Sequence, residues 1–180
     1  MDIIIQPSDK LDNDILNLLA DSISKEFVNF KVTVNPLLIF DIHDFISKHR
    51  NQLRSSDFLF WILEKLKPAK NIKILVICDI DAYSGDLNFV FGEAYREGRV
   101  AAIYLPRLRQ EFYGLESNKL VFHKRIVKEA IHELGHTFGL FHCNNELCVM
   151  HFSNSLYDTD IKEKSFCSNC KNNFRLKINE

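Results

Sequence analysis

The sequence contains the stretch HELGHTFGLFH at residues 132–142, which constrains both its fold and its chemistry. His132 and His136 lie four positions apart within a long segment of helical periodicity, so both imidazoles face the same side of one helix. Two imidazoles on one face can bind a single metal ion. Glu133 is rotated by about 100° from His132 and is free to accept a proton from a water molecule that such an ion activates.

A third histidine follows six residues after His136. A catalytic zinc takes three protein ligands and keeps one position open, so His142 is the expected third ligand. On a continuous helix it would lie about 15 Å from His132, and the chain therefore has to turn. Gly139 lies where that turn must begin, because glycine adopts positive φ without steric cost. We predict that His132, His136 and His142 bind a catalytic zinc and that Glu133 is the general base.

Four of the five cysteines lie in the last quarter of the chain and form two spaced pairs, Cys143-x4-Cys148 and Cys167-x2-Cys170. Four thiolates complete a closed tetrahedral zinc site, so we predict a second, structural zinc. Because Cys143 directly follows His142, this ion would fix the loop that carries the third histidine. Two disulfides, or four free thiols, are alternatives that the spacing leaves open.

The rest of the sequence predicts strands at residues 3–5, 31–34, 73–80, 87–94 and 99–105, with a hairpin turn at 96–98 between the last two. The remaining cysteine, Cys78, ends the apolar run at 74–77 and is expected to be an inert residue of a buried strand. Strands separated by helices favour parallel pairing, and the hairpin adds an antiparallel member. The prediction is an α/β (α+β) fold with a mixed twisted sheet.

Helical patterns cover residues 9–27, most of 37–67 with an N-cap at Ser56 and Asp57, and 118–139. The last helix carries the histidines and has an apolar stripe of Leu120, Val127, Ile131, Leu134 and Phe138. Periodicity ends at Gly139, which predicts an irregular tail. We expect a single domain, 1–180, in which 1–141 forms the sheet and helices and 142–180 forms a methionine turn and a cysteine-bound subdomain.

The composition is that of a globular protein, with 180 residues, 46% of them hydrophobic and 26% charged. A net charge of -1 and a pI near 6.7 provide no basic field for nucleic acid or an anionic membrane. No apolar run approaches the roughly 18 residues of a membrane span, and the first residues lack the basic start of a secretory signal. We expect a cytoplasmic monomer that binds neither nucleic acid nor membrane.

The histidine string followed by Met150 is similar to the metzincin superfamily of zinc peptidases. With the four cysteines, the pattern across residues 132–170 resembles the archaemetzincin family, although the sixteen residues between Met150 and Cys167 are one fewer than in the family pattern. The resemblance implies a metzincin-like fold, two zinc ions per chain, and hydrolysis of peptides or proteins in a shallow cleft. It also implies that Met150 lies beneath the metal, and it places Phe152 where some metzincins carry a tyrosine.

Two other classes of protein fit the same residues. One is a zinc protein of the same fold that binds peptides or a partner without cutting them, and the other is a purely structural zinc module. Glu133 argues against both, because binding alone needs no carboxylate beside the first ligand. Met150 on its own would be interpreted as an ordinary core methionine.

Several weaker candidates surround these motifs. Glu129 lies on the histidine face of the helix, where it either orients a ligand or, as we expect, forms a solvated charge at the cleft rim. The strand at 87–94 is a candidate edge for an extended peptide. Seven further basic or histidine side chains are involved in no motif; those expected on the surface include Lys124, Arg125, Lys128, His43, His49 and His123.

Overall fold

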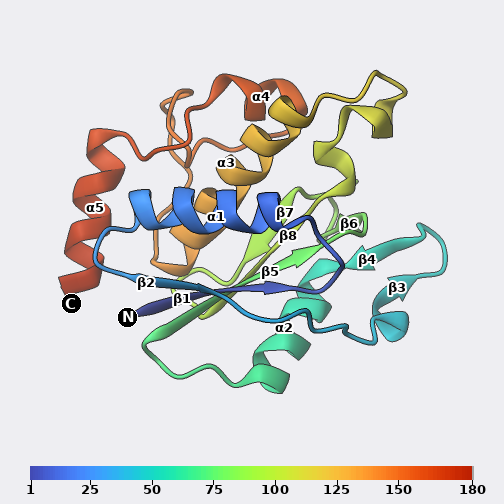
Figure 1. The fold of residues 1–180 in the computed structure, drawn as a ribbon, viewed down its shortest axis with the longest axis horizontal. Coiled ribbons are helices and arrows are strands. Elements are labelled where there is room, and N and C mark those ends of the chain that lie inside the picture. Colours follow the sequence, from blue (N-terminus) through green and yellow to red (C-terminus); the bar gives the residue numbers. More distant parts are fainter. Residues whose placement is uncertain (180) are drawn as a thin grey trace.

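A five-stranded mixed sheet in the order β2-β1-β5-β8-β7 forms the centre of the protein (Figure 1). The structure, a computed structural model, describes residues 1–179. The first four of these strands pair in parallel, and β7 pairs antiparallel with β8; the strands are β1 (Asp2–Pro7), β2 (Lys31–Val34), β5 (Ile72–Cys78), β7 (Gly92–Ala94) and β8 (Val100–Tyr104). The predicted α/β fold with an antiparallel hairpin is confirmed.

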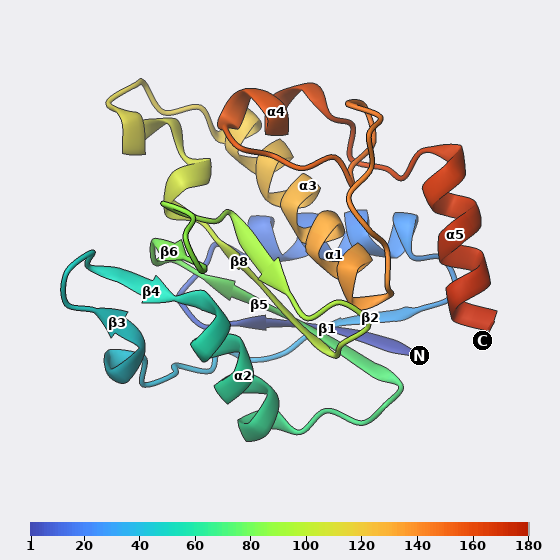
Figure 2. The ribbon, with the colours of Figure 1, turned by 180° about the vertical axis from the view of Figure 1, so that it is seen from behind.

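Helices cover both faces of this sheet (Figures 1 and 2). α1 (Asn13–Glu26) and α3 (Lys119–Thr137) lie on one face, and α2 (Ser55–Leu66) lies on the other. Strand β5 explains how one sheet supports two cores: Leu75 and Ile77 point toward α1 and α3, whereas Ile74 and Val76 point toward α2. A strand buried on both sides reads as a continuous apolar run, as β5 does. Cys78 is buried at its end, as expected, and burial raises the pKa of its thiol to about 12.

Residues 37–54 differ from the predicted helix. They form the 3-10 turn η1 (His43–Phe45) and the short strands β3 (Ile46–Ser47) and β4 (Gln52–Arg54), which pair with β6 (Ala82–Tyr83) in a second sheet. The apolar side chains here cover α2 and do not build a helix of their own; the ring of Phe40 contacts Phe58 and Trp61. The predicted N-cap is also displaced, because α2 begins at Ser55 after Arg54.

Two other predicted elements are shorter than expected. Only Gly92–Ala94 of the strand expected at 87–94 pairs in the sheet, because Phe89 and Phe91 pack their rings together in a loop before it. Helix α1 begins at Asn13, four residues later than the pattern suggested. In α3, Leu120 is 74% exposed and does not belong to the apolar stripe, whereas its other four members are buried.

The C-terminal tail is more regular than predicted. It contains α4 (Leu156–Ile161), which begins with a capping box between Ser155 and Asp158, and α5 (Ser168–Asn179). Both lie on the side of the sheet that carries α1 and α3 (Figures 1 and 2). The ring of Phe174 on α5 packs against Phe27 and Phe138, so the tail extends the same core.

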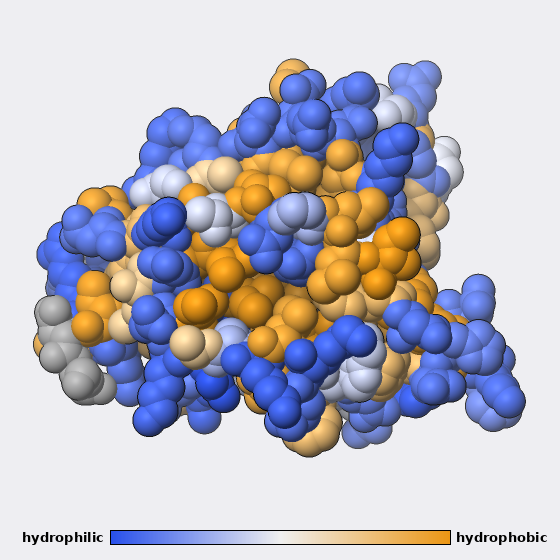
Figure 3. Space-filling view, turned by 60° about the horizontal axis from the view of Figure 1, so that its bottom comes forward, coloured by the Kyte–Doolittle hydropathy of each residue, from blue (hydrophilic) through white to orange (hydrophobic). Residues whose placement is uncertain are grey.

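The surface mixes hydrophilic side chains with apolar ones. Figure 3 shows a band of apolar side chains, bordered by hydrophilic residues, on the face that brings the bottom of Figure 1 forward. Within residues 1–179, no helix combines the length and the apolar character that a bilayer crossing requires. The short 3-10 segments η2 (Pro106–Leu108) and η3 (Gln110–Tyr113) connect β8 to the loop before α3.

Candidate active site

Helix α3 carries the first part of the site and is fixed at both ends. At its start, the side chain of Asn118 accepts a hydrogen bond from the backbone N–H of Val121. At its end, the buried ammonium of Lys73 on β5 donates to the carbonyl oxygen of Thr137 at 2.8 Å and to that of Gly98 in the hairpin turn at 2.6 Å. A cation near the last carbonyls of a helix is favourable, and here it also joins the helix to the sheet.

The chain turns back at Gly139, as predicted. This residue has φ of +86°, which favours glycine, and its N–H donates to the carbonyl oxygen of His136 at 2.9 Å. The N–H of Leu140 then donates to the carbonyl oxygen of Gly135. The turn carries His142 back toward the helix and places its ring 4.8 Å, centroid to centroid, from that of His136.

The structure brings His132, His136 and His142 together with their Nε2 atoms facing one another. The Nε2 atom of His136 lies 3.1 Å from that of His132 and 3.2 Å from that of His142. The Nδ1 atoms of His132 and His136 lie 2.8 Å from the carbonyl oxygens of Val149 and Leu140, respectively, which can only accept hydrogen bonds. The protons are therefore on Nδ1, and the lone pairs on Nε2 converge.

Converging lone pairs fit a metal ion. Nitrogen ligands at 2.0–2.1 Å from a tetrahedral zinc are separated by about 3.3 Å, close to the distances between these imidazoles. Burial lowers the pKa of all three side chains, with that of His136 brought to about 4, so the neutral, metal-binding form is favoured. The role of the three histidines as ligands remains a prediction, but the donor set suits zinc.

Glu133 is buried beside this cluster, with only 5% of its surface exposed. It approaches the sheet edge so closely that a Cβ atom on Gly92 would lie 2.6 Å from its Cγ atom. Burial raises the pKa of Glu133 well above its usual value; Glu129 adds to this effect, and Lys162 opposes it. A carboxylate in this setting accepts a proton more readily than one in water.

Met150 lies directly against α3 between the first two histidines. It is fully buried, and its Sδ atom would be only 2.5 Å from a Cβ atom on Gly135. The segment that contains it also accepts the hydrogen bond from His132, through Val149. On the other side of the site, the ring of Phe152 lies 4.9 Å from that of His142. The sulfur of Met150 thus packs under the helix that presents the histidines.

The four C-terminal cysteines also come together, with their sulfur atoms within 4.8 Å of one another. The sulfur atoms of Cys143 and Cys167 are 3.9 Å apart, far beyond the length of a disulfide bond and close to the separation of about 3.8 Å between thiolates on one zinc. Burial raises the pKa of Cys167, but hydrogen bonds from the Cys170 N–H and from the other cysteine side chains outweigh it and bring that pKa to about 7. This donor set suits a closed zinc site.

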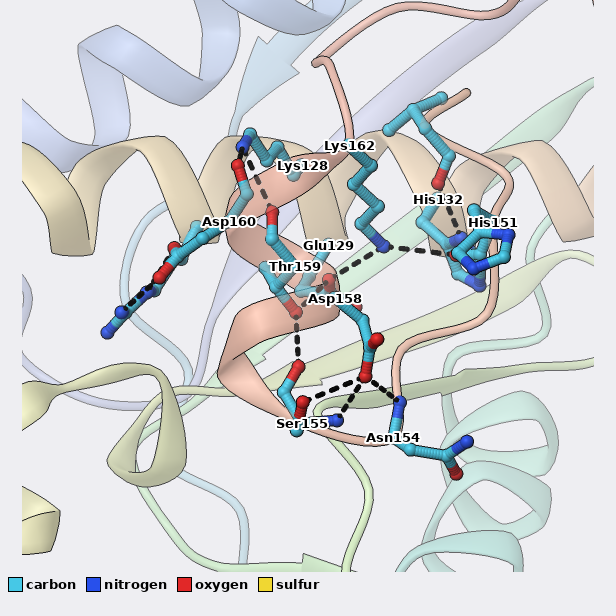
Figure 4. Close-up of polar contacts among 12 residues, drawn as sticks. Lys128, Glu129, His132, His151, Asn154, Ser155, Asp158, Thr159, Asp160 and Lys162 are labelled. Atoms are coloured by element: carbon cyan, nitrogen blue, oxygen red, sulfur yellow. Dashed lines mark hydrogen bonds and ion pairs between the residues drawn. The ribbon is translucent and has the colours of Figure 1, made fainter. Parts of the chain in front are cut away.

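Charged residues behind the histidines were interpreted wrongly from the sequence. Glu129 is 3% exposed and forms an ion pair of 2.9 Å with the fully buried Lys162, so it is not a solvated rim charge (Figure 4). Arg125 and Lys128 are also buried, because both reach to α4, where Arg125 pairs with Asp160. No periodicity around residue 162 indicated a buried lysine. The expected exposure of His43 and His49 is confirmed, and His123 is partly buried.

A cleft of about 480 Å³ opens in front of the histidines. One wall is the loop and strand at 87–94, and the other includes Phe141, Phe152 and Asn154. The guanidinium of Arg96 lies over the ring of Phe141, at 4.2 Å from its centroid, at the rim. The cleft therefore places an open sheet edge beside the imidazoles.

These features define a class of protein. A mixed sheet whose edge strand borders the cleft, a long helix with two histidines and a buried glutamate, a glycine turn that returns a third histidine, and a methionine beneath them are the arrangement of a metzincin-like zinc peptidase. Residues 28–176 match the model of Peptidase family M54, and the chain belongs to this family of archaemetzincins. It is a zinc-dependent peptidase, and its substrates are peptides or proteins.

Relatives and solved structures support this assignment. Archaemetzincin of Pyrococcus furiosus is 39% identical over 174 residues, which cover 93% of this chain and 89% of that protein. Archaemetzincin of Methanocaldococcus jannaschii is 41% identical and covers 94% and 90%. The crystal structure of archaemetzincin from Methanopyrus kandleri covers 100% of this chain and 96% of its own, with 30% identity and a TM-score of 0.86. That from Archaeoglobus fulgidus, complexed with malonate, has 36% identity, covers 96% and 99%, and has a TM-score of 0.78.

Proposed function

We propose that His132, His136 and His142 hold the catalytic zinc of this peptidase and that Glu133 is its general base. The observation that carries this proposal is the convergence of three Nε2 atoms while the Nδ1 atoms of the first two histidines face carbonyl oxygens. Imidazoles held in this way have no other partner for their lone pairs. Glu133 lies on the same helix, one residue after the first of them, and is shielded from solvent.

A bound zinc supplies Lewis acidity, which polarises a carbonyl and lowers the pKa of water. Glu133 accepts a proton from the attacking water and later donates it to the nitrogen of the leaving amine. Its raised pKa suits both steps, because the protonated form is accessible near neutral pH. The mechanism requires no covalent bond between the chain and the substrate.

The substrate backbone would lie along β7. This strand forms one edge of the five-stranded sheet and borders the cleft, and an extended peptide can pair with such an edge. The pairing edge is shorter than expected from the sequence, since only Gly92–Ala94 is a strand. It would hold a peptide bond beside Glu133, which contacts the strand at Gly92.

The four cysteines would hold a second, structural zinc, so that each chain carries two ions. Support comes from the sulfur atoms, which lie within 4.8 Å of one another with no disulfide among them. Cys143 follows His142 directly, and its N–H donates to the carbonyl oxygen of Met150 at 2.9 Å. Order at the cysteines would therefore extend to the third histidine and to the methionine turn.

The cellular setting follows from the same residues. Thiolate ligands persist in a reducing compartment, and we place the protein in the cytoplasm. Its net charge of -1 provides no attraction for nucleic acid or anionic lipid, so we expect neither as a partner. We propose that it is a single-domain monomer, with residues 142–180 as the metal-bound part of that domain.

A metal count followed by digestion of a peptide library tests the site. The wild-type protein should contain two zinc ions and cleave peptides, whereas Glu133→Gln should keep both ions and lose cleavage by a factor of at least about a hundred, as expected for a general base. Glu146→Gln, at an exposed position near the same loop, is the matched control and should cleave normally. Cleavage that survives in Glu133→Gln would exclude Glu133 as the base.

A further inference from the structure

Lys162 and Glu129 form an ion pair that solvent barely reaches. The two side chains are 0% and 3% exposed, and the Lys162 Nζ atom lies 2.9 Å from Glu129 Oε1. Removing two charges from water costs as much as, or more than, their attraction returns, so a buried pair is weak evidence for stability. A pair retained at such a place calls for a role other than stability.

The pair lies immediately behind the catalytic cluster (Figure 4). Glu129 belongs to α3, three positions before His132 and four before Glu133, and it lines the cleft. Thr159 donates a hydrogen bond from its hydroxyl to the same Glu129 oxygen, at 3.3 Å. Lys162 ends α4 and reaches toward the helix from there.

Lys162 also contacts the methionine turn. Its Nζ atom lies 3.4 Å from the carbonyl oxygen of His151, the residue that follows Met150. Two residues earlier, the carbonyl oxygen of Val149 accepts the hydrogen bond from Nδ1 of His132. The orientation of the His132 ring therefore depends on where the segment 149–151 lies relative to α3, and Lys162 contacts both.

We propose that Lys162 is a positioning residue that holds the segment 149–151 against α3 through Glu129 and so orients the imidazole of His132. The inference rests on the proposed role of His132 as a ligand. It assigns to the buried pair a function in the metal site that a purely structural contact between α3 and α4 would not have. A hydrogen-bond partner behind a metal ligand typically changes metal affinity or activity by about 10–100-fold when it is removed.

Lys128 provides a matched comparison within the same fold. It is also a buried lysine of the α3–α4 interface, and its Nζ atom donates to the carbonyl oxygens of Thr159 at 2.9 Å and Asp160 at 2.8 Å. Among the contacts of the described residues, it has none with segment 149–151 or with Glu129. Its removal should weaken the interface without affecting His132.

The test uses Co²⁺ in the histidine site of the full chain, with zinc first removed from that site by dipicolinic acid. Visible absorption reports the geometry of bound Co²⁺, and titration reports its affinity, neither of which requires peptide cleavage. The variants are Lys162→Met, the double variant Glu129→Met/Lys162→Met, and Lys128→Met as control. The double variant leaves no unpaired buried charge, so it should recover much of the thermal stability that Lys162→Met loses.

We expect the double variant to bind Co²⁺ about 10–100-fold more weakly than wild type, with a changed spectrum, and Lys128→Met to bind it normally despite a lower unfolding temperature. Glu129→Gln, which keeps the shape of the side chain, should show a smaller change in the same direction and serves if the double variant does not fold. A wild-type spectrum and affinity in these variants would overturn the positioning role alone. Unchanged Co²⁺ binding by His132→Gln would overturn the proposed function and this inference together.

Discussion

The backbone N–H of Glu97 donates a hydrogen bond of 3.0 Å to the carbonyl oxygen of His136. Glu97 lies in the turn between β7 and β8, so the sheet hairpin is bonded to the helix at the residue that carries the second imidazole. The same turn contacts Gly139, because a Cβ atom there would lie 3.0 Å from the Glu97 Cγ atom. The hairpin, the end of α3 and the turn toward His142 therefore form one connected unit.

Gly139→Ala should destabilise this unit and weaken the histidine site. An alanine with φ of +86° costs about 1–2 kcal/mol in stability, and its methyl group would press on Glu97. Gly114→Ala is the control, since Gly114 has φ of +74° but no atom within 4 Å of its Cβ position. Both variants should lower the free energy of unfolding in urea, but only Gly139→Ala should weaken zinc binding at the histidines. Equal zinc affinity in the two variants would contradict the connection.

Replacing ligands should remove the two zinc ions separately. His142→Ala should contain one zinc and remain folded, whereas Cys148→Ser should lose the other ion and much of its thermal stability, because metal binding at a thiolate site contributes directly to folding. Cys78→Ala, outside both clusters, is the control and should keep two ions. The measurements are metal content by mass spectrometry and thermal unfolding with and without chelator. One zinc in the Cys78→Ala protein would show that the cysteines had been assigned wrongly.

Arg125→Met should destabilise the protein by about 1.5–3 kcal/mol, the usual contribution of hydrogen bonds to a charged group. The Arg125 side chain is 5% exposed and donates from two nitrogens to Asp160, and from a third to the carbonyl oxygen of Leu108. The exposed neighbour Lys124 offers a control, because Lys124→Met should leave the free energy of unfolding nearly unchanged. Similar denaturation midpoints for the two variants would show that Arg125 is solvated, as the sequence had suggested.

Protein stripped of zinc at the histidine site should become less stable as the pH falls from about 6.5 toward about 4. Burial lowers the pKa of His136 from 6.5 to about 4, so in this window the unfolded chain binds a proton that the folded chain does not. Above the upper limit the side chain is neutral in both states and contributes no pH dependence. Urea unfolding at pH 7 and pH 5 measures the loss, which should be smaller in His136→Gln. Equal losses would show that His136 titrates normally.

The core of the site could be predicted because its signals are local. The spacing of His132 and His136 determines their common face, and a glycine at 139 permits the turn that returns His142. The four parallel strands were also predictable, since buried strands such as β5 are continuous apolar runs. The antiparallel hairpin followed from a turn of three residues.

Features that depend on contacts between distant segments could not be predicted. Lys162 looks like any solvent-exposed lysine in a polar stretch until α4 is placed beside α3, and Glu129 was interpreted wrongly for the same reason. Residues 37–54 have enough apolar side chains for a helix, but Phe40 serves to cover α2. In each case the tertiary partner, and not the local pattern, decides the burial of the side chain.

Positions 135 and 150 can be redesigned only as a pair. A methyl group at residue 135 would lie 2.5 Å from the sulfur of Met150, a separation that no packed interior tolerates. In a library that randomises residue 135 alone, active clones should retain glycine, whereas joint randomisation should also return alanine at 135 together with a shorter side chain at 150. Covariation between these two positions would thus be visible in a selection experiment before any further coordinates were determined.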